Sequence, residues 1–173
     1  MEVKDIKNIQ IACDLIESGL RLPLVNSLSG IESKRLLRGL WKEICGEKPN
    51  PGQLPDSVIR YIRDYQSAAE LSGFVALYRS IQENQGQIES YNKVRNSKLL
   101  LNPLTLLETW RAFKKLTGVS IDINAGYYVV RDIIFEIVLY ATCRSCSASF
   151  IFDPSKRHTE RCPFCRTLYI SKL

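Results

Sequence analysis

Apolar side chains recur at three- and four-residue steps along the first twenty residues of the chain. The series consists of Ile6, Ile9, Cys13, Ile16 and Leu20. This spacing predicts an amphipathic helix from about Asp5 to Ser18 that stops at Gly19 and carries Cys13 on its apolar stripe. Such a stripe can pack in the chain's own core or in the groove of a partner protein, and the pattern alone favours neither.

Two shorter helices are predicted before residue 46. Pro23 opens the segment PLVNSL, which we expect to end at Gly30. Ser33 is a suitable N-cap for the next helix, and Gly46 is a suitable C-terminal cap. The inward-facing residues of this helix are expected to be Leu36, Leu37, Leu40 and Ile44. Three short helices with a glycine turn before the last one, over about residues 5–46, resemble a helix-turn-helix.

The outer face of the third predicted helix is basic. Its cations are Lys34, Arg35, Arg38 and Lys42. In a helix-turn-helix protein the last helix enters the major groove, where residues near its start reach base edges and other cations meet phosphates. These four residues are therefore candidates for DNA contact. The alternative is an ordinary solvated face, because Glu32 and Glu43 dilute the charge.

The middle of the chain is also predicted to be mostly helical. A loop rich in proline and glycine spans residues 46–55, and a long helix is expected from Asp56 through Ala69. The polar stretch 82–98 predicts a connector. A proline near its start and a glycine at its end define a further helix over residues 103–118, and another is expected from about Asn124.

Four cysteines near the end of the chain form two CxxC pairs that are separated by fifteen residues. They are Cys143, Cys146, Cys162 and Cys165. This spacing is typical of zinc sites, because two such turns supply the four thiolates that structural zinc prefers. We expect one Zn²⁺ per chain, with no coordination position left open for catalysis. His158, the single histidine, lies between the pairs and is the alternative ligand.

The segments around these cysteines indicate a zinc ribbon. SASFIF, between the pairs, and TLYISKL, after them, have strand-like composition, and DPSKRH predicts a turn. A module of this size cannot bury enough surface to fold alone, whereas zinc binding supplies roughly 10 to 16 kcal/mol. Metal binding and folding of residues 139–173 are therefore expected to be inseparable.

The charge balance favours a polyanionic partner. The 173 residues include 24 Lys and Arg against 18 Asp and Glu, a formal net charge of +6. Residues 141–173 hold six Lys or Arg against two acidic residues, so the cysteine module is the most basic part. Its candidate DNA contacts are Arg144, Lys156, Arg157, Arg161 and Arg166. Double-stranded DNA is the partner that these charges favour.

Several classes of protein are disfavoured. The first residues lack the apolar run and cleavage site of a secretory signal, and the apolar stretch DIIFEIVLYATC is too short to cross a bilayer. We therefore expect a cytoplasmic protein without membrane contact. The sequence has no glycine-rich phosphate loop, and His158 has no recognisable nucleophile partner, so we do not expect an enzyme.

The order of these parts resembles the FlhC family, the C subunit of the flagellar master transcriptional activator. The resemblance covers about residues 4 to 165 and includes the segments KDIKNIQIACDLIESGLRLPLV and ESKRLLRGLWKEICGEKPNPGQLPDS. Its most specific elements are the pattern Gly52, Leu54 and Pro55 and the four cysteines. The resemblance implies a mainly helical protein that joins FlhD subunits in a hetero-oligomer, binds DNA upstream of flagellar operons and recruits RNA polymerase. It also implies that the four cysteines bind zinc.

The sequence thus predicts a mainly α protein with two parts. A multi-helix domain over residues 1–138 contains the helix-turn-helix-like part, and a four-cysteine zinc-ribbon module covers residues 139–173. The predicted function is that of a DNA-binding transcriptional regulator. Two alternatives do not involve DNA: a zinc-dependent protein-interaction adaptor, and a thiol-switch protein that uses the same cysteines reversibly.

Overall fold

The computed structural model describes residues 3–49, 52–87 and 99–169. The elements are α1 (Val3–Glu17), α2 (Leu22–Ser29), α3 (Lys34–Cys45), the 3₁₀ helix η1 (Val58–Tyr61), α4 (Tyr65–Asn84), α5 (Pro103–Thr117), α6 (Ile123–Ile134), β1 (Leu139–Thr142) and β2 (Ser149–Phe152). The fold is mainly α with a small C-terminal sheet, which confirms the predicted class. None of the helices among these residues has the length and hydropathy needed to span a membrane.

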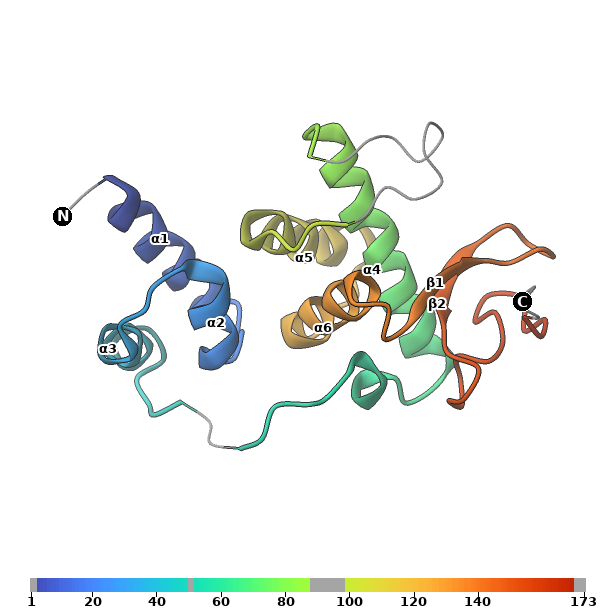
Figure 1. Ribbon diagram of the computed structural model, residues 1–173, viewed down its shortest axis with the longest axis horizontal. Helices are drawn as coiled ribbons and strands as arrows, with labels where there is room; N and C mark the ends of the chain where they lie inside the picture. The colour runs from blue at the N-terminus through green and yellow to red at the C-terminus, as the bar shows by residue number, and fades with distance from the viewer. Residues whose placement is uncertain (1–2, 50–51, 88–98, 170–173) are drawn as a thin grey trace.

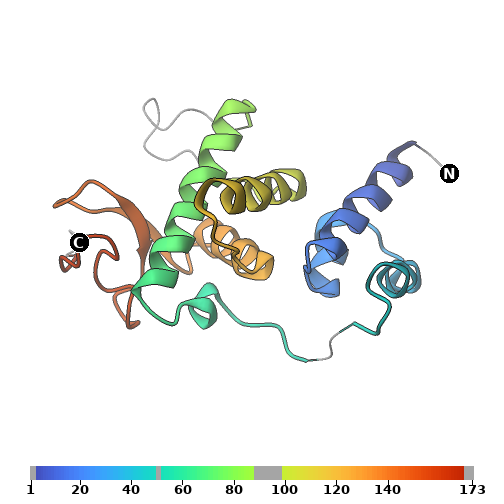
Figure 2. The same ribbon diagram turned by 180° about the vertical axis from the view of Figure 1, so that it is seen from behind.

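The elements are grouped along the longest axis of the molecule. Helices α1, α2 and α3 lie at one end, the β1–β2 hairpin lies at the other, and α4, α5 and α6 lie between them (Figures 1 and 2). The segment after α3 runs along one side of the molecule to reach η1. The basic helix α3 and the cysteine module are therefore far apart.

Helix α1 packs on the chain's own core through its second half. Leu15, Ile16 and Leu20 are buried there together with Ala12. Ile6 is 51% exposed, so the expectation of one continuous stripe from Ile6 to Leu20 is wrong at its start. The reason is that the first turns of α1 extend past α2 and α3, as Figure 1 shows.

Helix α3 has the predicted caps and a slightly rotated apolar face. The hydroxyl of Ser33 accepts a hydrogen bond from the Leu36 N–H at 3.2 Å, and Gly46 closes the helix at φ 74°. Leu37 and Trp41 are buried, whereas Leu36, expected to face inward, is 41% exposed. A stripe centred on positions 37 and 41 places position 36 about 100° away, because each residue turns the helix by that angle.

The long helix expected from Asp56 is interrupted. The chain forms the short helix η1, passes through extended backbone, and starts α4 only at Tyr65. The interruption comes from a capping box, in which Asp64 Oδ1 accepts from the Ser67 N–H at 2.7 Å and Ser67 Oγ accepts from the Asp64 N–H at 3.1 Å. These bonds satisfy the first amides of a new helix.

The connector and the later helices follow the sequence more closely. Helix α4 continues to Asn84, so the predicted connector begins too early, and residues 88–98 lie outside the described part of the chain. Helix α5 is capped by Asn102 and Gly118, within one residue of the predicted bounds. Helix α6 begins at Ile123, one residue before the predicted start.

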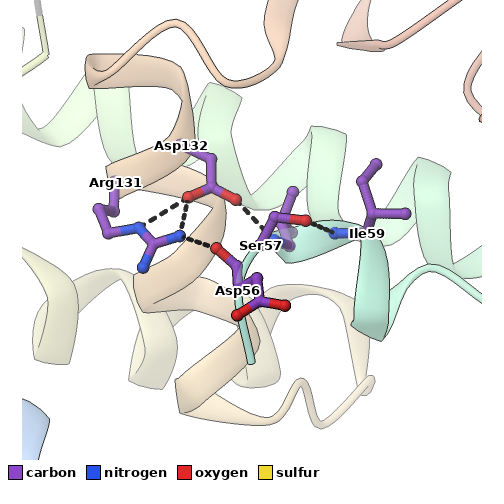
Figure 3. Close-up of polar contacts among 6 residues, drawn as sticks. Asp56, Ser57, Ile59, Arg131 and Asp132 are labelled. Carbon is purple, nitrogen blue, oxygen red and sulfur yellow. Dashed lines mark hydrogen bonds and ion pairs between the residues drawn. The ribbon is translucent and has the colours of Figure 1, made fainter. Parts of the chain in front are cut away.

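The end of the segment after α3 is fixed on α6 by a buried carboxylate (Figure 3). Asp132 is fully buried, and its Oδ2 accepts from the Val58 N–H at 2.6 Å. Its Oδ1 accepts from Nε of Arg131 at 2.7 Å, and Nη2 of Arg131 donates to the Asp56 carbonyl at 2.6 Å. The guanidinium also lies 4.3 Å from the ring centroid of Tyr128. These contacts hold η1 against α6.

A second clamp holds the same segment nearer to α3. The guanidinium of Arg21 donates to the Gly52 carbonyl at 2.7 Å and to the Gln53 carbonyl at 2.9 Å. The main-chain N–H of Arg21 donates to the Asn124 side chain at 2.9 Å, which ties the α1–α2 turn to the start of α6. The α1–α3 end is thus joined to the rest by polar contacts as well as by the core.

The hairpin lies on α4. β1 and β2 are antiparallel, with Tyr140 opposite Ile151. Ile151 belongs to the main core and Tyr140 packs against that core, while Phe150 and Phe152 form a second cluster with Cys143 and Cys162. The predicted strand SASFIF is confirmed as β2, and β1 has no counterpart among the predicted elements. Of the strand expected after the second pair, the described residues show one isolated bridge, Arg161 to Leu168, and residues 170–173 lie outside them.

Candidate metal centre and nucleic-acid interface

The four cysteine sulfurs converge on one point. They come from the end of β1, the turn before β2 and the turn at residues 162–165, and all lie within 4.8 Å of one another. The distance from Cys143 Sγ to Cys165 Sγ is 3.6 Å, and that from Cys146 Sγ to Cys162 Sγ is also 3.6 Å. A tetrahedral site with Zn–S bonds of about 2.3 Å has sulfurs about 3.8 Å apart. The four cysteines can therefore hold a metal ion, and their spacing fits zinc.

The two CxxC turns have the same backbone geometry. Ser147 N–H donates to the Cys143 carbonyl at 2.9 Å, and Arg166 N–H donates to the Cys162 carbonyl at 2.9 Å. Ser147 and Arg166 both have left-handed backbone, with φ of 61° and 64°. The amides that follow point at sulfurs, since the Ala148 N–H bonds to Cys146 Sγ. Paired turns of this kind direct amide dipoles at the thiolates that a metal requires.

Local contacts give the thiols different acidities. The hydroxyl and main-chain amide of Thr167 lower the pKa of Cys165 to about 6. Burial raises the pKa of Cys162 to about 12. Because thiolates are the ligands, binding of a metal at this site releases the protons that the thiols still carry.

His158 lies outside the converging set. Its ring stands edge-on to Tyr65, with ring centroids 5.0 Å apart, and its backbone has φ of 70°. The ligand atoms that gather within the described residues are the four sulfurs alone. The alternative in which His158 replaces a cysteine therefore has no geometric support.

A basic groove runs along α3 at the other end of the molecule. Its volume is about 1540 Å³, and its walls come from the start of α2, from α3, from the segment that follows α3, and from η1 and the start of α6. Five cations line it: Arg21, Lys34, Arg38, Lys42 and Lys48. Two acidic residues, Glu47 and Asp122, lie among them. The groove therefore has an excess of positive charge that suits a polyanion.

Three of the predicted α3 cations share one stripe of the helix. Lys34, Arg38 and Lys42 are spaced by four residues and line the groove. Arg35 is exposed but is not among the lining residues. Sequence reasoning missed Arg21 and Lys48, because neither belongs to the α3 pattern. Arg21 directly precedes α2, which packs on α3, and Lys48 follows the end of α3.

The predicted cations of the cysteine module are all exposed. They are Arg144, Lys156, Arg157, Arg161 and Arg166. Two of them have contacts within the chain. The guanidinium carbon of Arg166 lies 3.9 Å from the ring centroid of Tyr65, and Nη1 of Arg161 donates to the Arg166 carbonyl at 3.4 Å. The module and the α3 groove lie at opposite ends of the molecule, so they form two separate basic surfaces (Figure 1).

Comparisons with a family model and with individual proteins indicate the same family. The model of a family described as flagellar transcriptional activator (FlhC) matches residues 2–169. The flagellar transcriptional regulator FlhC of Gallionella capsiferriformans (strain ES-2) is 28% identical over 154 residues, which cover 89% of this chain and 80% of that protein. The protein of the same name from Sodalis glossinidius (strain morsitans) is 27% identical over 169 residues, or 94% of this chain and 79% of that protein. The one from Proteus mirabilis is 26% identical over 149 residues, covering 86% and 72%.

Proposed function

Because the chain belongs to the family of flagellar transcriptional activators named FlhC, we propose that it is a DNA-binding subunit of an activator that works on flagellar or motility promoters. It acts in the cytoplasm, where promoter DNA is found, and it acts by binding rather than by catalysis. Double-stranded promoter DNA, an FlhD-type subunit and RNA polymerase are its proposed partners.

The observation that carries this proposal is the row of cations along α3. Lys34, Arg38 and Lys42 line the groove together with Arg21 and Lys48. Eight residues of helix extend about 12 Å at 1.5 Å per residue. One DNA strand carries a phosphate about every 3.4 Å of axis, so the row can meet the phosphates of about three or four nucleotides. This groove is our primary DNA-binding surface.

The cysteine site is proposed to bind one structural Zn²⁺ through all four thiolates. The ion holds together the two CxxC turns and the small aromatic cluster beside them, and with four protein ligands it leaves no position for substrate. The division into a helical domain, 1–138, and a zinc-ribbon module, 139–173, is part of this proposal. The exposed cations of the module supply a second set of phosphate contacts.

A partner subunit is needed because one groove and one ribbon offer few base contacts. Specific sites typically demand about 4 to 10 kcal/mol of discrimination over bulk DNA. An assembly that links two copies of these surfaces makes the second contact intramolecular. The apolar row Phe135, Ile137 and Leu139, with exposed fractions of 68%, 49% and 50%, supports a protein partner. The same row is the observation that favours the alternative, an adaptor that binds only protein.

The experiment compares salt dependence in matched variants of the purified complex. Each lost phosphate contact should reduce the slope of log affinity against log salt by about 0.9. We expect Arg38→Ala with Lys42→Ala to lower both affinity and slope, and Arg157→Ala with Arg161→Ala to act in the same direction at the ribbon. Arg35→Ala, which removes a charge outside the groove, is the control. Unchanged affinity and slope in both double variants would remove these surfaces from the account.

A further inference from the structure

The first residue of α4 is enclosed by the cysteine module. The guanidinium carbon of Arg166 lies 3.9 Å from the ring centroid of Tyr65, and the His158 ring stands edge-on to it at 5.0 Å. The Tyr65 hydroxyl donates a hydrogen bond to Oε1 of Glu160 at 3.0 Å. Three residues of the module thus contact one side chain of the helical part. We refer to Tyr65, His158, Glu160 and Arg166 as the Tyr65 clasp.

The clasp is built around the second CxxC turn. Glu160 lies two residues before Cys162, and Arg166 directly follows Cys165. The left-handed backbone of Arg166 is fixed by the turn itself, through its N–H bond to the Cys162 carbonyl at 2.9 Å. The turn therefore sets the point from which the Arg166 side chain reaches the Tyr65 ring.

On the helical side of the clasp, hydrogen bonds fix the position of α4. Tyr65 follows the N-cap Asp64, whose capping box with Ser67 sets the start of α4. Two turns further along α4, Ser72 contacts both strands. Its hydroxyl accepts from the Ile151 N–H at 3.1 Å, and its carbonyl accepts from the Tyr140 hydroxyl at 3.0 Å. One side of α4 therefore supports the second CxxC turn through Tyr65 and the hairpin through Ser72.

We propose that Tyr65 is a positioning residue for the metal centre. The clasp holds the turn that carries Cys162 and Cys165 in its metal-binding form, and so makes release of the metal depend on the start of α4. The inference rests on the proposed zinc site. Because coupling between two sites is reciprocal, the metal should in turn stabilise the first turn of α4.

The size of the effect follows from the kind of contact. Residues that orient metal ligands from outside the coordination shell typically change metal affinity by about 10- to 100-fold when they are removed. Tyr65→Leu removes the ring contacts and the hydroxyl together, so we expect zinc release to accelerate about tenfold. Tyr65→Phe removes only the bond to Glu160, and we expect release to accelerate about two- to threefold, in line with the loss of one partly exposed hydrogen bond.

The test measures transfer of zinc from the full-length chain to an excess of a chromogenic chelator. Arg166→Gln is the second variant, since it removes the stacked guanidinium from an exposed position that does not threaten folding. Lys156→Gln is its matched control, because it removes one exposed charge from the same module outside both CxxC turns. We expect faster release in Tyr65→Leu and Arg166→Gln and unchanged release in Lys156→Gln.

A second readout separates positioning from general stability. Hydrogen exchange at the amides of Ser67 and Ala68 should accelerate when zinc is removed from the wild-type chain, and should respond little to zinc in Tyr65→Leu. If Tyr65→Leu and Arg166→Gln both bind zinc stoichiometrically and release it at the wild-type rate, the positioning role of Tyr65 is overturned and the zinc site stands. A wild-type chain that binds no zinc would overturn the metal proposal and this inference with it.

Discussion

The buried carboxylate of Asp132 offers a sharp test of how the segment after α3 is held on α6. It accepts the Val58 N–H at 2.6 Å and pairs with Arg131, whose side chain is 20% exposed. Replacing Asp132 by Ala leaves the amide of Val58 buried without its acceptor and removes the acidic partner of Arg131. η1 should then detach from α6 more readily.

The expected loss follows from these contacts. Removing one member of a buried pair typically costs about 3–5 kcal/mol, because the remaining polar groups keep their desolvation penalty. Asp132→Asn keeps one acceptor oxygen for Val58 but replaces the other with an NH2 group that faces the Arg131 guanidinium, so a loss of about 1.5–3 kcal/mol is expected. Asp56→Ala is the control. The Asp56 side chain is 81% exposed in a 3.9 Å pair with Arg60, and Arg131 uses only its carbonyl. This change should cost less than about 0.5 kcal/mol.

Urea unfolding of the zinc-loaded chain, followed by circular dichroism, measures these differences. The order of stability should be wild type and Asp56→Ala together, then Asp132→Asn, then Asp132→Ala. A free energy of unfolding for Asp132→Ala within 0.5 kcal/mol of that for Asp56→Ala, roughly the noise of surface substitutions, would refute the reasoning.

Three other changes test separate parts of the fold. A Cβ at Gly126 would lie 2.8 Å from Phe74, so Gly126→Ala should destabilise by about 1–3 kcal/mol in urea unfolding, whereas Gly39→Ala, with nothing within 4 Å, should stabilise α3 by about 0.5–1 kcal/mol. Equal effects would be inconsistent with this packing. Cys162→Ser should abolish stoichiometric zinc in elemental analysis, and full zinc content would rule out the four-cysteine site. Ser147→Gly should keep zinc and raise the unfolding midpoint by relieving left-handed strain of about 0.5–1 kcal/mol; a lowered midpoint would contradict that strain.

The features that could be predicted from the sequence are those set by local chemistry. The caps at Ser33, Gly46 and Gly118 and the two CxxC pairs act within a few residues, so their outcome does not depend on distant parts of the chain. Zinc-like spacing of four sulfurs follows directly from such turns.

Other features depend on contacts that no local pattern contains. The start of α4 at Tyr65 depends on the reciprocal hydrogen bonds between Asp64 and Ser67, and the periodicity of apolar residues contains no information about these bonds. In the sequence, Asp132 interrupts an apolar run. In the structure its buried carboxylate accepts a hydrogen bond from the N–H of Val58, which lies 74 residues away in the chain. Arg21 lines the basic groove because the start of α2 packs beside α3, a contact that no local pattern contains.

The central claim, partner-dependent recognition of promoter DNA, is tested most directly by one binding measurement. The chain alone, and the chain co-purified with an FlhD-type subunit, are titrated against a labelled flagellar promoter fragment and a shuffled fragment at one physiological salt concentration. The account predicts that the complex binds the promoter at least about 10³-fold more tightly than the shuffled DNA, and that the chain alone shows little preference. Equal binding of the complex to both fragments, or full discrimination by the chain without a partner, would contradict it.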